Sequence, residues 1–379
     1  MRNALCVKYN TVNPFTLYGY EGAAFFCNRE KETVTLINAL ENGRNTTLIS
    51  IRRLGKTGLI HHSLSKLKRD FDCVYVDIMA TSTLTEFTEV FGKAVLNQLE
   101  HPIAKSWNTI SGLFRKIKPV FSLDPLNGAP QLEFDLKSNS ESEITLEDIF
   151  KFLEKRKKKV IVALDEFQQV AGYPEKKTEA LLRTHIQRLK NVRFIFAGSQ
   201  KHLLTAMFND ASRPFYQSTE FMYLKRIEKD AYAKFINRHF TLASKKITSP
   251  CIDEIMEWTK VHTFYVQALC NKLYSLSEKN IDNKILKRIC FDILTQNEGT
   301  FINYKNLLPT QQWNLLKAIA KEDAVSRLNQ KSFLNKYHLS ASSVQRSIKA
   351  LLQREMVVEE EGVYQVYDVF LGRWLAAKF

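Results

Sequence analysis

Residues 47–60 read TLISIRRLGKTGLI, which is a short β-rich run, a loop and the start of a helix. This order is the context of a phosphate-binding loop, the Walker A motif. Backbone N–H groups of the loop and the helix start form a nest for phosphate oxygens. Gly55 permits close backbone approach, Lys56 can reach the β- and γ-phosphates, and the Thr57 hydroxyl can ligate magnesium. We therefore expect ATP with Mg²⁺ in this loop.

One loop position departs from the motif, because Ser50 stands where the first glycine belongs. A left-handed backbone there would cost about 1 kcal/mol or more for serine. The loop therefore either enters with another shape or carries modest strain. On this motif alone, a chance match in a basic chain stays open. The expected nucleotide-contacting residues of the loop are Ser50, Arg52, Arg53, Leu54, Gly55, Lys56, Thr57 and Gly58.

A second motif argues against the alternative that the Walker A sequence is a chance match. The apolar run VIVAL at 160–164 delivers Asp165 and Glu166 at its end, which is the Walker B arrangement. Asp165 would hold the magnesium through water, as the second metal residue beside Thr57, and Glu166 would polarise the attacking water. Ser199, after the run at 194–197, is a candidate sensor of the γ-phosphate. Its alternative is an ordinary helix N-cap.

Strand-like and helix-like runs alternate over the first half of the chain, which predicts a doubly wound α/β sheet of parallel strands. An extra strand between the two Walker strands indicates the P-loop ATPases that use a glutamate. We expect a P-loop ATPase core over 1–225. An insert at about 101–146 would hold a β-hairpin made by 120–123 and 131–136 around DPLNGAP. The polar stretch KSNSESE should be a loop, with Thr145 capping the helix that follows.

Strands should stop after about residue 226. Four segments with helical periodicity follow, the last at 283–294, and they predict a helical lid domain over 226–300. Residues 301–379 show the winged-helix order of helix, short helix, longer helix and β-wing. In the longer helix, 341–355, five side chains should face outward. DNA contact and protein or intramolecular contact both stay open, because the acids at 359–361 on the wing would repel phosphate. The outward side chains are Ser342, Ser343, Gln345, Arg346 and Lys349.

Composition bounds the remaining classes. The chain has 379 residues and a net charge of +15, which favours acidic partners, nucleic acid or anionic surfaces without identifying one. The basic run at 155–159 is most simply a solvated helix end. The six cysteines show neither C-x-x-C nor zinc spacing. The N-terminus has no apolar signal region, and no apolar run is long enough to cross a membrane, so we expect a cytoplasmic protein.

Five segments together resemble the STAND and AAA+-like ATPases of bacteria and archaea, most closely the MNS-type "archaeal ATPase" family. They are FFCNREKET at 25–33, NTTLISIRRLGKTGLI at 45–60, VALDEFQQV at 162–170, FIFAGSQKHLL at 194–204 and YVQALCNKL at 265–273. The resemblance implies that Arg29 lies near the nucleotide. It also implies a lid proline, at whose position this chain has Thr263. Arg213 is a candidate arginine finger, with an ordinary solvated surface arginine as the alternative.

These features favour an ATP-binding, slowly hydrolysing molecular switch whose nucleotide state controls the packing or partner binding of the helical and winged-helix domains. Its partners would be another protein or a second copy of the chain. The alternative is a nucleotide-sensing DNA-binding regulator that acts through the winged helix. A metabolic kinase is disfavoured, because no acceptor-binding signature follows the loop.

Overall fold

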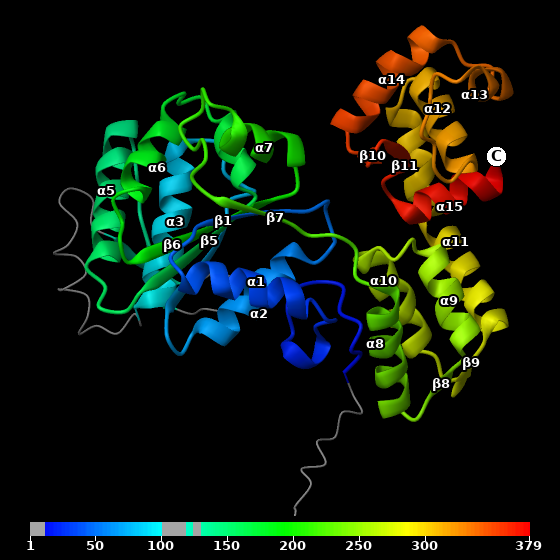
Figure 1. The fold of residues 1–379 in the computed structure, drawn as a ribbon, viewed down its shortest axis with the longest axis horizontal. Helices are drawn as coiled ribbons and strands as arrows, with labels where there is room; N and C mark the ends of the chain where they lie inside the picture. Colours follow the sequence, from blue (N-terminus) through cyan, green and yellow to red (C-terminus); the bar gives the residue numbers. More distant parts are fainter. Residues whose placement is uncertain (1–11, 101–118, 124–129) are drawn as a thin grey trace, which may run out of the picture. The chain divides into compact units, whose positions relative to one another are not determined.

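The computed structural model describes residues 12–100, 119–123 and 130–379 (Figure 1). The chain divides into two compact units. One spans Tyr18–Arg226, and the other comprises Ile227–Phe379 with the segment that ends at Leu17. No helix among the described residues is long and apolar enough to cross a membrane.

The first unit is built on a five-stranded sheet in the order β2-β5-β6-β1-β7. All four pairings are parallel, so the prediction of a P-loop α/β sheet is confirmed. β6 lies between β1 and β5, and the carboxyl ends of the strands meet at one edge. The strands are β1 (Thr46–Ile49), β2 (Asp72–Asp77), β5 (Val160–Asp165), β6 (Val192–Gly198) and β7 (Glu220–Tyr223).

Helices cover both faces of this sheet, and β5 shows why. Its side chains alternate between two cores: Val160, Val162 and Leu164 pack on one face, and Ile161 and Ala163 on the other. Both faces of β5 are therefore buried, as its continuous apolar run predicts. The first face is covered by α3 (Leu84–Leu99), α5 (Asn139–Glu154), α6 (Thr178–Ile186) and α7 (Lys201–Asn209), and the second by α1 (Glu30–Glu41) and α2 (Lys56–Leu67).

The start of α5 corrects the sequence interpretation. KSNSESE is not a loop, because the helix begins at Asn139 inside it. Ser138 is the N-cap, and its hydroxyl accepts a hydrogen bond from the Glu141 N–H at 3.3 Å. Thr145, the expected cap, is buried within the helix. The earlier capping residue, Ser138, satisfies the helix start in place of Thr145.

The insert contributes a small two-stranded sheet. β3 (Val120–Leu123) and β4 (Pro130–Glu133) pair in antiparallel register, with Val120 opposite Glu133. The second strand is thus shorter at its end than the expected 131–136. The rest of the expected insert at 101–118, and the turn at 124–129, lie outside the described residues.

The second unit begins with four helices, and here two expectations were wrong. Strands do not stop at residue 226, since β8 (Lys246–Ile247) and β9 (Asn280–Ile281) pair in parallel. The fourth helix does not end at Leu294, where the predicted periodicity stops, but continues to Leu307. The helices are α8 (Lys229–Leu242), α9 (Ser249–Trp258), α10 (Thr263–Tyr274) and α11 (Asn283–Leu307).

The winged helix follows in the same unit. The wing strands are antiparallel, and a bridge from Val325 to Tyr364 adds a third strand position. A final helix, which the sequence interpretation missed, buries Phe370 and Trp374 among other apolar residues. The elements are α12 (Thr310–Lys321), α13 (Lys331–Lys336), α14 (Ala341–Gln353), β10 (Val357–Glu360), β11 (Val363–Val366) and α15 (Val369–Lys378).

Candidate nucleotide site

The loop from β1 to α2 has the shape of a phosphate nest. Gly55 is the N-cap of α2, with a left-handed φ of 93°, and Arg53 is also left-handed, with a φ of 63°. Ser50 is not among the residues with positive φ, so the strain considered for it does not arise. The Ser50 side chain is buried, and its hydroxyl has no hydrogen-bond partner among the described residues. The serine is therefore accommodated by a different backbone at the loop entry.

The two Walker segments meet at Asp165. The Lys56 ammonium pairs with Asp165 Oδ1, and the Thr57 hydroxyl donates to Asp165 Oδ2 at 2.7 Å. Lys56 and Asp165 are both buried. Burial alone would raise the pKa of Asp165, but the Lys56 charge and the hydrogen bonds from Lys56 and Thr57 hold that pKa below its ordinary value. Asp165 is thus held as a carboxylate at the end of β5.

Glu166 lies at the centre of a second set of contacts. Its Oε1 is 3.1 Å from the Lys56 ammonium, while its Oε2 accepts from Gln168 at 2.6 Å and from the Ser199 hydroxyl at 3.1 Å. Arg52 in turn donates to Ser199 at 3.3 Å. Glu166 adopts a left-handed φ of 58°, which is uncommon for a non-glycine residue. The structure thus brings together Lys56, Asp165, Glu166 and Ser199, which the sequence interpretation placed in one site.

Tyr75 belongs to this site, although the sequence interpretation missed it. Its hydroxyl donates to Asp165 Oδ2 at 3.1 Å, and its ring packs on His61 with centroids 4.3 Å apart. Burial, and then the charges of Asp165 and Asp77, raise the pKa of Tyr75, so it remains a donor. The alternation Cys73, Val74, Tyr75 along β2 marks the face that Tyr75 occupies, but the sequence carries no signal for its partner.

Arg29 lies against the loop as part of its frame. It is buried, and its guanidinium donates to the carbonyl of Leu54 at 3.0 Å and to that of Lys225 at 2.5 Å. It also pairs with Glu32 at 2.8 Å. The side chain therefore joins the phosphate loop to the end of the sheet unit. These hydrogen bonds to two backbone carbonyls and to Glu32 give Arg29 a positioning part at the loop.

The remaining predicted site residues occupy varied surroundings. Leu54 is buried, so its backbone is the part that can face a phosphate, while Arg53 is exposed. A Cβ added at Gly58 would lie 3.3 Å from the Phe26 ring, so this glycine permits close packing of the N-terminal segment. Arg213 pairs with Glu179 at 3.1 Å. Thr263 begins α10 in the other unit.

The donor set is suited to magnesium. Mg²⁺ prefers oxygen ligands and is usually bound through one or two protein oxygens together with phosphates and water. The Thr57 hydroxyl and the Asp165 carboxylate converge within 2.7 Å at the end of the loop. One hydroxyl and one carboxylate beside a phosphate nest are what such an ion requires.

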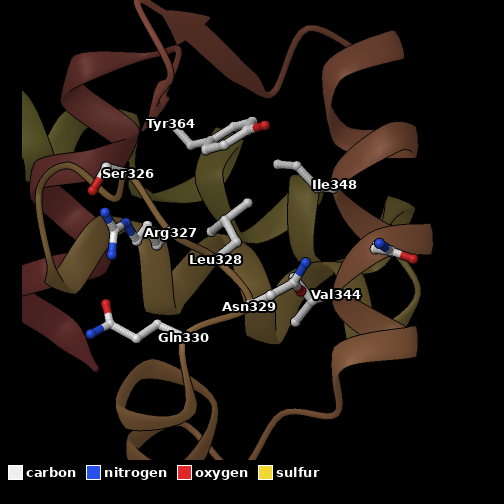
Figure 2. A pocket seen from close by; sticks show the side chains of 9 residues that line it. Ser326, Arg327, Leu328, Asn329, Gln330, Val344, Ile348 and Tyr364 are labelled. Atoms are coloured by element: carbon white, nitrogen blue, oxygen red, sulfur yellow. The ribbon is translucent and has the colours of Figure 1, made fainter.

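The winged helix carries a hollow of about 630 Å³ between the 326–330 segment, α14 and β11. Figure 2 shows Ile348 and Tyr364 pointing toward one another across one end of it. Ser343, expected to face outward on α14, is instead buried, and its hydroxyl donates to Gln311 at 2.9 Å. The other four predicted outward side chains of α14 are exposed: Ser342, Gln345, Arg346 and Lys349.

Comparison with solved structures shows the same fold. The chain resembles the Walker-type ATPase PABY2304 of Pyrococcus abyssi, with a TM-score of 0.66 and 20% identity over 96% of this chain and 99% of that one. It also resembles the ORC2 protein of Aeropyrum pernix, with a TM-score of 0.56 and 13% identity over 97% and 98%. The Aeropyrum pernix ORC1 protein in complex with DNA gives a TM-score of 0.50 and 14% identity over 93% of each chain.

Comparison with protein families is more specific. No curated protein matches the sequence. The model of a probable winged helix domain matches residues 299–377, and that of an ATPase domain predominantly from Archaea matches residues 26–263. The second match includes both Walker segments and covers most of the chain. The resemblance drawn from the sequence is thereby confirmed, and the chain belongs to the family of P-loop ATPase domains found predominantly in Archaea.

Proposed function

We propose that this protein is an ATP-binding and slowly hydrolysing molecular switch whose nucleotide state controls the packing or partner binding of its second unit. The observation that carries the proposal is the convergence of Lys56, Thr57, Asp165 and Glu166 at one sheet edge. Family membership supports nucleotide binding.

Each side chain has a task in this proposal. The loop N–H groups and the Lys56 ammonium neutralise the phosphate charge, for which Lys56 exchanges its carboxylate partners for phosphate oxygens. Thr57 and Asp165 would hold a magnesium ion, which would supply positive charge to stabilise the transferred phosphoryl group. Glu166 orients the attacking water and accepts its proton.

The contact of Ser199 with Glu166 suits a sensor, because a shift at the γ-phosphate would reach Ser199 through one hydrogen bond. Arg52 donates to the same hydroxyl from the loop itself. Arg213, held by Glu179, is retained as a candidate arginine finger for a neighbouring site.

Arg29 offers a path from the loop to the second unit. It bonds the Leu54 carbonyl in the loop and the Lys225 carbonyl, two residues before the chain enters the second unit at Ile227. A change in the loop on nucleotide binding would therefore alter the hydrogen bonding where the chain leaves the sheet. This link favours a switch over a protein that binds nucleotide without a change in its second unit.

The test is the ATP affinity of Lys56→Ala, measured by calorimetry with Mg²⁺ present. We expect a loss of about 10-fold or more, since a hydrogen bond to a charged group contributes about 1.5–3 kcal/mol. Lys66→Ala, an exposed lysine on the same helix, is the matched control and should bind as the parent does. Unchanged ATP binding by Lys56→Ala would refute the proposal.

The second candidate function is a nucleotide-sensing DNA-binding regulator that acts through the winged helix. The exposed Gln345, Arg346 and Lys349 on α14 favour it, because such side chains pair with base edges and phosphates. The acids of the wing oppose it. It predicts duplex binding whose log affinity falls linearly with log salt concentration. An Arg346→Gln, Lys349→Gln double variant should bind the duplex more weakly than the parent. No retention on duplex DNA at low salt would exclude it.

A further inference from the structure

The amino-terminal edge of the main sheet is unusually rich in positive charge. β2, β5 and β6 are neighbours and run parallel, so the turns that precede them meet at one edge. That edge lies about 20 Å from the nucleotide edge, because β5 has six residues at about 3.3 Å each. The exposed cations on these turns are Lys66, Lys68 and Arg69 before β2, Lys155, Lys157 and Lys159 before β5, and Arg188 and Lys190 before β6. We call these residues the basic edge.

The basic edge is held rigid by polar bonds between its turns. Arg156 bonds Asp72 through two nitrogens, at 3.0 and 2.8 Å, and also pairs with Glu100. Lys158 donates to the Lys68 carbonyl at 2.8 Å. On the other side, Asn191 donates to the carbonyls of residues 153, 154 and 156 at 3.1–3.4 Å. The three turns are thus fixed to one another.

Three of the five cations of the central turn have no ion-pair partner among the described residues. Among the described residues, no acid lies within ion-pair distance of Lys155, Lys157 or Lys159. Three acids of the edge are already engaged by other cations, Asp72 and Glu100 by Arg156 and Asp70 by Arg69 at 3.4 Å. Among the described residues of these turns, Glu154 is the exposed acid without an ion pair. A solvated helix end would not require hydrogen bonds and ion pairs that join it to the turns before the two neighbouring strands.

We propose that the basic edge binds the phosphate backbone of a double-stranded nucleic acid, independently of the winged helix. Lysines are point charges that neutralise phosphates without reading bases. Single strands are typically held by stacking their bases on aromatic rings. The aromatic residues beside these turns in the described chain, Phe71 and Phe152, are buried, so a duplex is the better occupant.

An acidic protein is the competing occupant, and the composition of the edge disfavours it. Protein interfaces draw most of their energy from buried aromatic, arginine and apolar anchors. The exposed part of the basic edge is mostly lysine, which such interfaces avoid. Phosphate contacts, in contrast, need only exposed cations at fixed positions.

The experiment measures binding of the full chain to a labelled mixed-sequence duplex of about 30 base pairs, from about 50 to 300 mM KCl. The site variant is Lys155→Gln, Lys157→Gln, Lys159→Gln. The matched control is Lys279→Gln, Lys284→Gln, Lys287→Gln, which removes the same charge from exposed lysines of the other unit. Both variants should keep parental ATP affinity and melting temperature, because none of these exposed side chains makes a hydrogen bond or ion pair within the described part of the chain.

We expect the site variant to reduce the slope of log affinity against log salt by about 2 to 3, since each phosphate contact contributes about 0.9. The control should keep the parental slope. Equal slopes in the two variants would overturn the proposal. So would displacement of the duplex by poly-glutamate at an equal concentration of charge, which would assign the basic edge to an acidic protein instead.

Discussion

The hydroxyl of Tyr75 donates a hydrogen bond to Oδ2 of Asp165, the oxygen that also accepts from Thr57. Tyr75 comes from β2, whereas Asp165 ends the neighbouring strand β5. The proposed metal carboxylate therefore has an orienting partner on the strand beside it. Partners of this kind fix how a ligand oxygen points toward the metal.

Tyr75→Phe removes this donor and retains the ring on His61. In the proposed function, we expect the Mg²⁺ concentration for half-maximal ATPase activity to rise by about 10-fold, because loss of an orienting partner typically costs 10- to 100-fold in metal affinity. Stability should fall by only about 1 kcal/mol, the usual contribution of one hydrogen bond. A magnesium titration at saturating ATP checks the first effect, and urea unfolding checks the second. An unchanged magnesium requirement would show that Tyr75 only packs.

Arg29→Ala should destabilise the first unit by about 2–4 kcal/mol, because it removes a buried guanidinium that donates to the carbonyls of Leu54 and Lys225. The stability of Arg29→Lys should lie between that of this variant and that of the parent, since one ammonium cannot reproduce the hydrogen bonds of the guanidinium to three acceptors. Arg69→Ala, whose side chain is 91% exposed, is the control and should stay within about 0.5 kcal/mol of the parent. Urea unfolding measures the stability of all three variants. If Arg29→Ala is as stable as the parent, Arg29 does not hold the loop in place.

The sheet could be predicted because its signals are local. β5 is apolar throughout and delivers acids at its end, and β1 leads into a glycine loop, so strand identity and site position both follow from short segments. The helix boundaries were harder. At α5, Ser138 and Thr145 both suit an N-cap, and the choice depends on packing that buries Thr145. α15 was missed because its apolar residues lack the polar alternation that marks a surface helix.

The site residues that could be predicted are those that belong to short sequence motifs. Lys56 and Asp165 belong to motifs, whereas Tyr75 acts through a pairing with Asp165 that only the strand order creates. Arg29 was placed near the site by resemblance, yet its three hydrogen bonds to protein could not be inferred from its own segment. Ser50 looked strained only because a glycine-like backbone was assumed for it.

Asp77→Asn should stabilise the nucleotide-free protein at neutral pH. Asp77 lies beside Asp165 in the sheet register. Partial desolvation raises the pKa of Asp77, the Met79 N–H lowers it, and the charges of Asp165 and Glu166 raise it against that of Lys56, with a net upward shift. An acid whose pKa is higher in the folded state costs stability above that pKa, and the cost disappears as the pH falls below the unfolded value.

The difference in melting temperature between Asp77→Asn and the parent should therefore be largest near pH 7 and vanish below about pH 3.8. Asparagine can keep the acceptor for the Met79 N–H, which lies 2.8 Å from Asp77 Oδ1. Melting curves recorded across this range check the sign. A difference that grows as the pH falls would mean that the Asp77 carboxylate is stabilised by the fold.

Glu166→Gln separates binding from chemistry. The glutamine oxygen can still accept from Ser199 and Gln168, so the frame of the site should persist. The amide cannot accept a proton from water, and removal of a general base typically costs 10²- to 10⁴-fold. We expect ATP affinity within about 3-fold of the parent and turnover reduced by at least about 100-fold. Single-turnover hydrolysis with labelled ATP measures the chemical step directly. Parental turnover in Glu166→Gln, together with loss of activity in Asp77→Asn, would move the base from the end of β5 to the end of β2.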